Sequence, residues 1–307
     1  WEHFARRLAN QKYNIYITGS NAKMLSREIA TTLGGRFWNK DVYPYSFAEY
    51  LNARDIILSK NWMYGKQAAE VSKAFNDYFL YGGFPELTDV IAKRVWLNDI
   101  YSKIFFSDLI VRNKVRNEEA LGLLVRRLAE NVKQPVSYTR LANLISSIGI
   151  KISKATVIEF IRYLKESCLI FPIENYAAKF AERNSNMKHY FIDNGLLSIF
   201  LLDGNTSLLE NIVAIHLYKR YGAQLYFYNQ NIEVDFVIPE AKTAIQVSYS
   251  LMDETTCRRE VEGLIKLNRV FPMDNMCIIT RDEERIITHE SGVSIHVIPV
   301  WKWLLEE

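Results

Sequence analysis

The chain has 307 residues, of which 49% are hydrophobic and 24% are charged, a mixture too apolar for a disordered protein. It contains no run of about eighteen apolar residues, which excludes a transmembrane helix, and its first residues lack the pattern of a signal peptide. We therefore expect a cytoplasmic protein of two or three packed units with no membrane partner. The three cysteines lie far apart without a CxxC pair, so we interpret them as reduced core residues.

The net charge of +3 conceals an uneven distribution. Residues 93–190 carry 17 Lys and Arg against 9 Asp and Glu, whereas residues 191–307 carry 10 against 17. The basic middle could be an anion-binding surface, although solvated helices also collect basic residues.

The first 45 residues predict a short piece of an α/β layer. Apolar spacing and turn residues indicate a helix over 1–10, a strand over 13–18, a helix over 22–33 and a strand over 36–42. Asn21 directly follows the first strand, at the edge where ligands bind in open α/β sheets. One strand, one helix and one strand cannot close such a layer.

Residues 46–117 are dominated by helical periodicity, which predicts a lid-like helical region. The sequence Gly82-Gly83-Phe84-Pro85 interrupts it. A tight turn with backbone angles that only glycine adopts at low cost explains these glycines better than a catalytic role.

Residues 118–192 have the order of a winged helix-turn-helix: three helices and then two extended segments. We predict helices over 118–130, from Ser137 to 144 and over 154–167, then extended segments over 169–173 and 189–192. In DNA-binding versions of this fold the third helix enters the major groove and the wing contacts phosphates. The basic residues expected there are Lys151, Lys154, Arg162, Lys165, Arg183 and Lys188. The alternative is a protein-interaction winged helix whose third helix packs on neighbouring domains.

Several short motifs, taken together and in order, resemble one family. They are Ile17-Thr18-Gly19-Ser20-Asn21, Tyr43-Pro44-Tyr45-Ser46-Phe47-Ala48-Glu49-Tyr50, Tyr81-Gly82-Gly83-Phe84-Pro85-Glu86, Leu209-Glu210-Asn211 and Glu233-Val234-Asp235-Phe236. The chain resembles prokaryotic AAA-type ATP-binding proteins with a C-terminal restriction-endonuclease-like region of unknown role. The resemblance covers essentially the whole chain.

The resemblance also implies a nucleotide site that this sequence does not complete. Such proteins carry a GxxxxGK[ST] phosphate loop and acidic residues ahead of the position where this chain starts, and bind ATP and magnesium there. We expect no ATP hydrolysis by this chain alone and no cofactor of its own, and we interpret it as a fragment of a longer product. Asn21 then resembles the sensor near the terminal phosphate, or simply caps a helix. Arg36 resembles an arginine finger, or forms a surface ion pair.

Residues 193–307 predict a second α/β unit. We expect a helix over 208–221, strands over 225–228, 232–238 and 244–250, a helix over 255–268, and strands over 276–280 and 293–299. This is the order of a restriction-endonuclease-like core. In active nucleases of this class a helix glutamate, a strand aspartate and an (E/Q)xK pair converge, so that carboxylates hold metal ions and lysine helps to activate water.

Glu210, Asp235 and Gln246 occupy the catalytic positions of that class, but the site is degenerate. Ser248 stands where the lysine belongs, and Gln246 supplies a neutral carbonyl. Glu233 faces the same side as Asp235 and could replace the missing charge, leaving weak metal binding by this pair. The alternative is structural, with Glu210 capping its helix and Gln246 bonded to Thr255 or Arg258.

We therefore predict a multidomain α/β protein. Its parts are a partial AAA-type core (1–45), a helical lid (46–117), a winged helix (118–192) and a restriction-endonuclease-like domain (193–307). Its expected role is binding of double-stranded DNA or protein, with a metal-dependent nuclease or a purely regulatory protein as alternatives. Unpaired strand edges predict a homo-oligomer.

Overall fold

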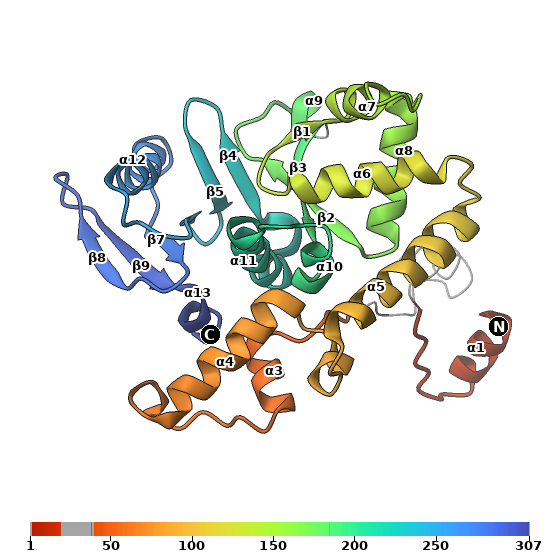
Figure 1. The fold of residues 1–307 in the computed structure, drawn as a ribbon, viewed down its shortest axis with the longest axis horizontal. Coiled ribbons are helices and arrows are strands. Elements are labelled where there is room, and N and C mark those ends of the chain that lie inside the picture. The colour runs from red at the N-terminus through yellow and green to blue at the C-terminus, as the bar shows by residue number, and fades with distance from the viewer. Residues whose placement is uncertain (1, 20–37, 39, 184, 307) are drawn as a thin grey trace.

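The computed structural model describes residues 2–19, 38, 40–183 and 185–306, which form a mixed α/β molecule around a nine-stranded sheet (Figure 1). The initial helix is present as α1 (Glu2–Asn10). Residues 13–18 form no strand, contrary to prediction, because no described segment pairs with their backbone. Asn21, Arg36 and the helix predicted over 22–33 lie outside the described residues. None of the described helices is long and apolar enough to cross a membrane.

The predicted helical region is present between residues 46 and 112. Its elements are α3 (Phe47–Ala53), η2 (Trp62–Tyr64), α4 (Lys66–Tyr81), η3 (Pro85–Thr88), α5 (Lys93–Lys103) and the π-helical η4 (Ile104–Val111). The first begins with a capping box: the Ser46 hydroxyl accepts from the backbone N–H of Glu49, whose carboxylate accepts from the backbone N–H of Ser46. This reciprocal pair satisfies two N–H groups that helices otherwise leave open.

The glycine turn after α4 is required by close approach. Gly82 has a φ of 81°, as the sequence predicts, and a Cβ there would lie 1.9 Å from Oδ1 of Asp193. A Cβ on Gly83 would lie 2.3 Å from the carbonyl oxygen of Tyr45. The backbone N–H of Gly83 donates to Asp193 at 2.8 Å. The turn therefore attaches the helical region to residues more than a hundred positions later.

The three helices and two extended segments expected over 118–192 are also present. They are α6 (Glu118–Glu130), α7 (Tyr138–Ser146), α8 (Lys154–Glu166), β2 (Ile170–Asn175) and β3 (Asn186–Phe191), with β1 (Val136–Ser137) and α9 (Phe180–Arg183) in addition. The hydroxyls of Ser137 and Ser153 cap α7 and α8 as predicted. Strand β3 pairs antiparallel with both β1 and β2.

The last third is α/β, as predicted. Its elements are α10 (Asn194–Ser198), α11 (Asn205–Tyr221), η5 (Gly222–Gln224), β4 (Tyr226–Asn229), β5 (Glu233–Ile238), β6 (Thr243–Val247), α12 (Glu254–Val270), β7 (Asn275–Thr280), β8 (Arg285–Thr288), β9 (Ser294–Pro299) and α13 (Val300–Trp303). Strands β4, β5 and β6 pair antiparallel, and β6, β7 and β9 are parallel. The edge strand β8 was not predicted.

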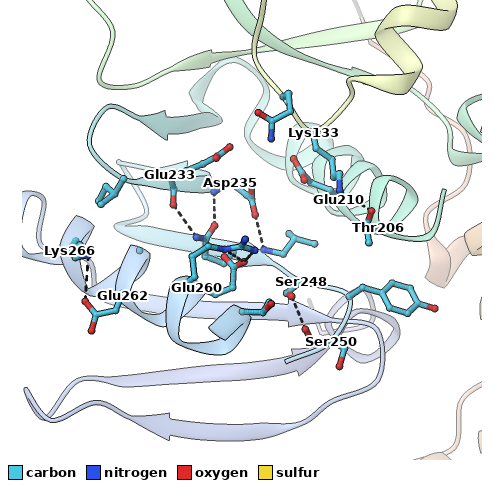
Figure 2. A pocket seen from close by; sticks show the side chains of 18 of the residues that line it. Lys133, Thr206, Glu210, Glu233, Asp235, Ser248, Ser250, Glu260, Glu262 and Lys266 are labelled. Carbon is cyan, nitrogen blue, oxygen red and sulfur yellow. Dashed lines mark hydrogen bonds and ion pairs between the residues drawn. The ribbon is translucent and has the colours of Figure 1, made fainter. Parts of the chain in front are cut away.

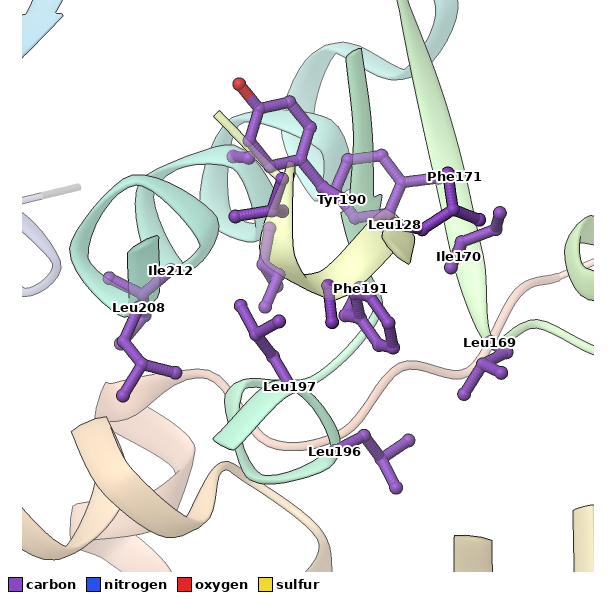
Figure 3. Packing of buried hydrophobic residues seen from close by; sticks show 14 of the residues in the cluster. Leu128, Leu169, Ile170, Phe171, Tyr190, Phe191, Leu196, Leu197, Leu208 and Ile212 are labelled. Atoms are coloured by element: carbon purple, nitrogen blue, oxygen red, sulfur yellow. The ribbon is translucent and has the colours of Figure 1, made fainter. Parts of the chain in front are cut away.

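The sheet joins the middle of the chain to its last third. Strand β2 pairs in parallel with β4 through Glu174 opposite Tyr226 and Asn175 opposite Phe227, giving the order β1-β3-β2-β4-β5-β6-β7-β9-β8. Buried side chains follow the same connection: one apolar cluster runs from Phe47 to Leu304. Figure 3 shows its centre, where Leu128 of α6, Phe171 of β2, Phe191 of β3, Leu197 of α10 and Ile212 of α11 meet. The packing therefore crosses the domain limits predicted at residues 117 and 192.

Candidate functional site

The residues that the sequence singles out for nuclease chemistry lie together. Glu210 projects from α11, Glu233 and Asp235 from β5, and Gln246 from β6, with Ser248 just beyond that strand (Figure 2). They line one side of a polar opening of about 710 Å³. Helix α11 is buried on nearly every side, so Glu210 is held with little freedom.

A lysine that the sequence places elsewhere occupies the centre of this group. The Nζ atom of Lys188 lies 3.1 Å from Glu210, 3.1 Å from Asp235 and 3.5 Å from Glu233. The Lys188 side chain is 0% exposed. It arrives from β3 and passes over the ring of Phe227 on β4, with Nζ 5.6 Å from the ring centre. Although burial opposes the charge, these carboxylates raise the pKa of Lys188 above its usual range, so Lys188 remains an ammonium.

Tyr190, two residues along β3, completes the buried group. Its hydroxyl donates to Oε1 of Glu210 at 2.6 Å. Burial raises the pKa of Glu210 to about 7, against the opposing effects of Lys188 and the Tyr190 hydrogen bond. Burial and the neighbouring Glu210 raise the pKa of Tyr190 well above its usual value, so the phenol remains a hydrogen-bond donor.

Gln246 has the structural role that we considered, but with different partners. Its carbonyl oxygen accepts from the backbone N–H of Asp235 at 2.9 Å, and its amide donates to the backbone carbonyl of Glu233 at 3.0 Å. These bonds are to the neighbouring strand β5 and not to Thr255 or Arg258. The Ser248 hydroxyl donates to the backbone carbonyl of Ser250 at 3.0 Å and does not replace a lysine.

The carboxylates of Asp235 and Glu210 already accept hydrogen bonds from other groups of the chain. Asp235 accepts from Lys188 through Oδ1 and from the backbone N–H of Val247 through Oδ2, at 3.0 Å. Glu210 accepts from Lys188 and Tyr190 and does not cap its helix. Among the described residues no three His, Cys, Asp or Glu side chains are placed to hold a metal ion. The predicted pair of Asp235 and Glu233 meets at the ammonium group of Lys188, which lies between their carboxylates.

Basic side chains surround the opening above the carboxylates. Lys133 donates to the Thr206 hydroxyl at 2.8 Å. Lys266 pairs with Glu262 at 3.8 Å, and Arg259 pairs with Glu260 at 2.6 Å. Each cation at this rim thus already has a partner within the chain.

The basic residues expected on a DNA-binding surface divide into two groups. Lys151, Lys154, Arg162 and Lys165 are exposed on α8 and the turn before it. Arg183 is half-buried and donates to the backbone carbonyls of Tyr176 and Ala178, so it orders a loop. Lys188 was expected on the exposed wing, and this is wrong, because it is fully buried among the carboxylates.

Sequence reasoning missed Lys188 and Tyr190 as members of the site. A usable signal exists in β3, where a lysine lies within an otherwise largely apolar run, Met187-Lys188-His189-Tyr190-Phe191. A lysine in a buried strand needs a partner of opposite charge. Which carboxylates would supply it cannot be read from the order of residues.

Comparisons with known proteins find two family models and two uncharacterized relatives. A family model described as an AAA domain matches residues 1–51, and one described as a domain of unknown function (DUF8612) matches residues 72–207. The uncharacterized protein MJ1544 of Methanocaldococcus jannaschii is 33% identical over 319 residues, covering 99% of this chain and 72% of that protein. An uncharacterized protein of Haemophilus influenzae is 31% identical over 302 residues, covering 95% and 71%. No solved structure matches.

Proposed function

Because this chain belongs to the family of the uncharacterized protein MJ1544 and its residues 1–51 match an AAA domain, we propose that it is the DNA-binding, non-cleaving portion of an AAA-type ATP-binding protein. In this proposal α6, α7, α8, β2 and β3 form a winged helix. The succession of α11, β4, β5, β6, α12 and β7 forms a restriction-endonuclease-like core. ATP and magnesium belong to the intact protein, and this chain alone does not hydrolyse ATP.

The observation that carries the proposal is the exposed basic face of α8. Lys154, Arg162 and Lys165 lie at spacings of eight and three residues, which places them on one side of the helix, and Lys151 precedes its first turn. The adjoining side of the helix is buried and carries Val157, Phe160 and Leu164. These four basic side chains are exposed to solvent in the part of the chain that the structure describes.

Phosphate contacts by these residues have a measurable signature. Four contacts predict that the logarithm of the DNA association constant falls with the logarithm of salt concentration with a slope of about −3.6. We expect the triple variant Lys154→Gln, Arg162→Gln, Lys165→Gln to weaken binding of a fluorescent 20-base-pair duplex and to flatten this slope by about 3. Fluorescence anisotropy at several salt concentrations measures both.

A matched control removes the same charge elsewhere. Lys60, Lys66 and Lys73 are exposed on and before α4, away from α8 in Figure 1. Their replacement by glutamine should leave the slope unchanged. Equal effects of the two triple variants would show that DNA binding depends only on the net charge of the chain, and would refute a site on α8.

The proposal predicts no cleavage, because Lys188 is already bonded to the carboxylates that would hold metal ions in a nuclease. With Lys188 bonded among Glu210, Glu233 and Asp235, we expect no nicking of plasmid DNA in Mg²⁺ or Mn²⁺. Any nicking must be compared with Asp235→Ala. Cleavage by the unmodified chain that disappears in this variant would refute the proposal.

The same lysine favours a second candidate, a metal-dependent nuclease. Lys188 brings an ammonium group to the carboxylates although position 248 holds serine. The nicking experiment decides between the two functions. ATP hydrolysis by this chain above the level of a mock purification would contradict the part of the proposal that concerns ATP.

A further inference from the structure

A second cavity, of about 720 Å³, lies beside the C-terminal half of α11 and is separate from the carboxylate centre. Its floor consists of Ile245, Cys277 and Ile298, which come from the three adjacent strands β6, β7 and β9. Helix α11 forms one wall with His216 and Arg220, and α13 contributes Trp303. Its volume lies within the range of about 300–1,000 Å³ that small-molecule pockets have.

Two aromatic rings, from His216 and Trp303, line one wall of this cavity. The rings of His216 and Trp303 lie 4.6 Å apart at an angle of 56°. Burial lowers the pKa of His216 to about 4, so its ring is neutral at pH 7 and can stack or accept a hydrogen bond. Within the described chain neither ring nitrogen of His216 nor the indole N–H of Trp303 has a hydrogen-bond partner. A flat ring placed on the apolar floor would lie beside these two rings.

The mouth of the cavity carries the guanidinium of Arg220 and the carboxylates of Asp274 and Glu306. Arg220 is exposed and, among the described residues, forms no ion pair with a carboxylate. The two acidic residues at the rim are already paired: Asp274 lies 3.4 Å from Lys242, and Glu306 lies 3.9 Å from Lys302. An anionic group on a bound ring would therefore find an unpaired guanidinium. Cys277, whose pKa burial raises to about 12, remains a neutral thiol in the floor.

We propose that this cavity binds a small, flat aromatic molecule that carries an anionic group, with the ring between the sheet and the His216–Trp303 wall and the anion on Arg220. Nucleotides and aromatic carboxylates share this chemistry. The site goes beyond DNA binding by α8 and uses none of the residues assigned to it. Failure of either proposal therefore leaves the other unaffected.

Titration calorimetry with adenosine 5′-monophosphate, adenosine and indole-3-carboxylate tests the site. We expect saturable binding of one of the two anions at millimolar concentration or below, and weaker binding of adenosine than of its monophosphate. Arg220→Gln should weaken anion binding about tenfold or more, because a charge-assisted hydrogen bond is lost. The preferred anion distinguishes a nucleotide site from an aromatic carboxylate site.

Two further variants exclude indirect effects. Trp303→Leu should abolish binding, whereas Arg259→Gln, at the rim of the carboxylate opening, should leave it unchanged. Because Arg220 is exposed, Arg220→Gln should keep the circular dichroism spectrum of the unmodified chain. If neither anion saturates by about 2 mM, or if Arg220→Gln binds as tightly as the unmodified chain, the site is refuted.

Discussion

Replacement of the buried lysine tests the description of the carboxylate centre most directly. Lys188→Met keeps an unbranched side chain over Phe227 but removes the ammonium group that Glu210, Glu233 and Asp235 share. Removing one partner of a buried ion pair costs about 3–5 kcal/mol, because the remaining charge stays buried without compensation. Glu233 is 42% exposed on its side chain, so Glu210 and Asp235 account for most of this loss. We expect the melting temperature to fall by about 10 °C.

The loss should depend on pH in a definite direction. The pKa of Glu210 is already raised by burial to about 7, and without Lys188 it should rise further. A carboxyl group whose pKa is higher in the folded than in the unfolded state destabilises the fold as pH rises from the unfolded value through the folded one. The difference in melting temperature between Lys188→Met and the unmodified chain should therefore be smaller at pH 5 than at pH 8.

Differential scanning fluorimetry from pH 5 to pH 8 measures this difference. The double variant Lys188→Met, Glu210→Gln should recover part of the loss at pH 8, since one of the uncompensated charges is removed. In addition, Mn²⁺ should stabilise Lys188→Met and not the unmodified chain, because a cation can then enter among the carboxylates. A change below about 2 °C, or an equal loss at pH 5 and pH 8, would refute our account of the centre.

Three smaller predictions concern other buried groups. His189 is buried with neither ring nitrogen bonded within the described chain, and burial lowers its pKa to about 4. The fold should therefore lose up to about 3 kcal/mol of unfolding free energy as pH falls from 6.5 to 4, and His189→Leu should not show this loss. Parallel pH dependences of the two proteins in urea titrations would contradict this. Gly83→Ala should destabilise the fold by about 2 kcal/mol or more, because its Cβ meets the Tyr45 carbonyl, whereas Gly65→Ala, with open space around it, should have little effect in thermal melts. Gln246→Leu should cost about 1–3 kcal/mol in urea unfolding by leaving two backbone groups of β5 unbonded, and a neutral result would show that water replaces the amide.

Local patterns in the sequence predict most of the helices. The helix over 118–130 is predicted with its observed bounds, and Ser137 and Ser153 begin the next two helices, because caps and apolar spacing act within a few residues. The positive φ of Gly82 is likewise predicted from the local sequence Gly82-Gly83-Phe84-Pro85, although its contact with Asp193 is not. By contrast, the strand predicted over 13–18 is not formed, since alternation favours an extended chain but pairing depends on a neighbour.

The candidate site shows the limit of this reasoning. The sequence singled out Glu210, Asp235 and Gln246 through its resemblance to restriction-endonuclease-like proteins, and it places a serine at position 248. Only the tertiary structure decided that Lys188 supplies a cation there, from a position 47 residues before Asp235. The parallel pairing of β2 with β4 brings β3 within reach of β5, and this pairing joins segments more than fifty residues apart. The sequence pattern of a strand predicts which of its faces is buried but not which strand lies beside it. The contact of Lys188 on β3 with Asp235 on β5, which has β2 and β4 between the two strands, therefore depends on the assembled sheet.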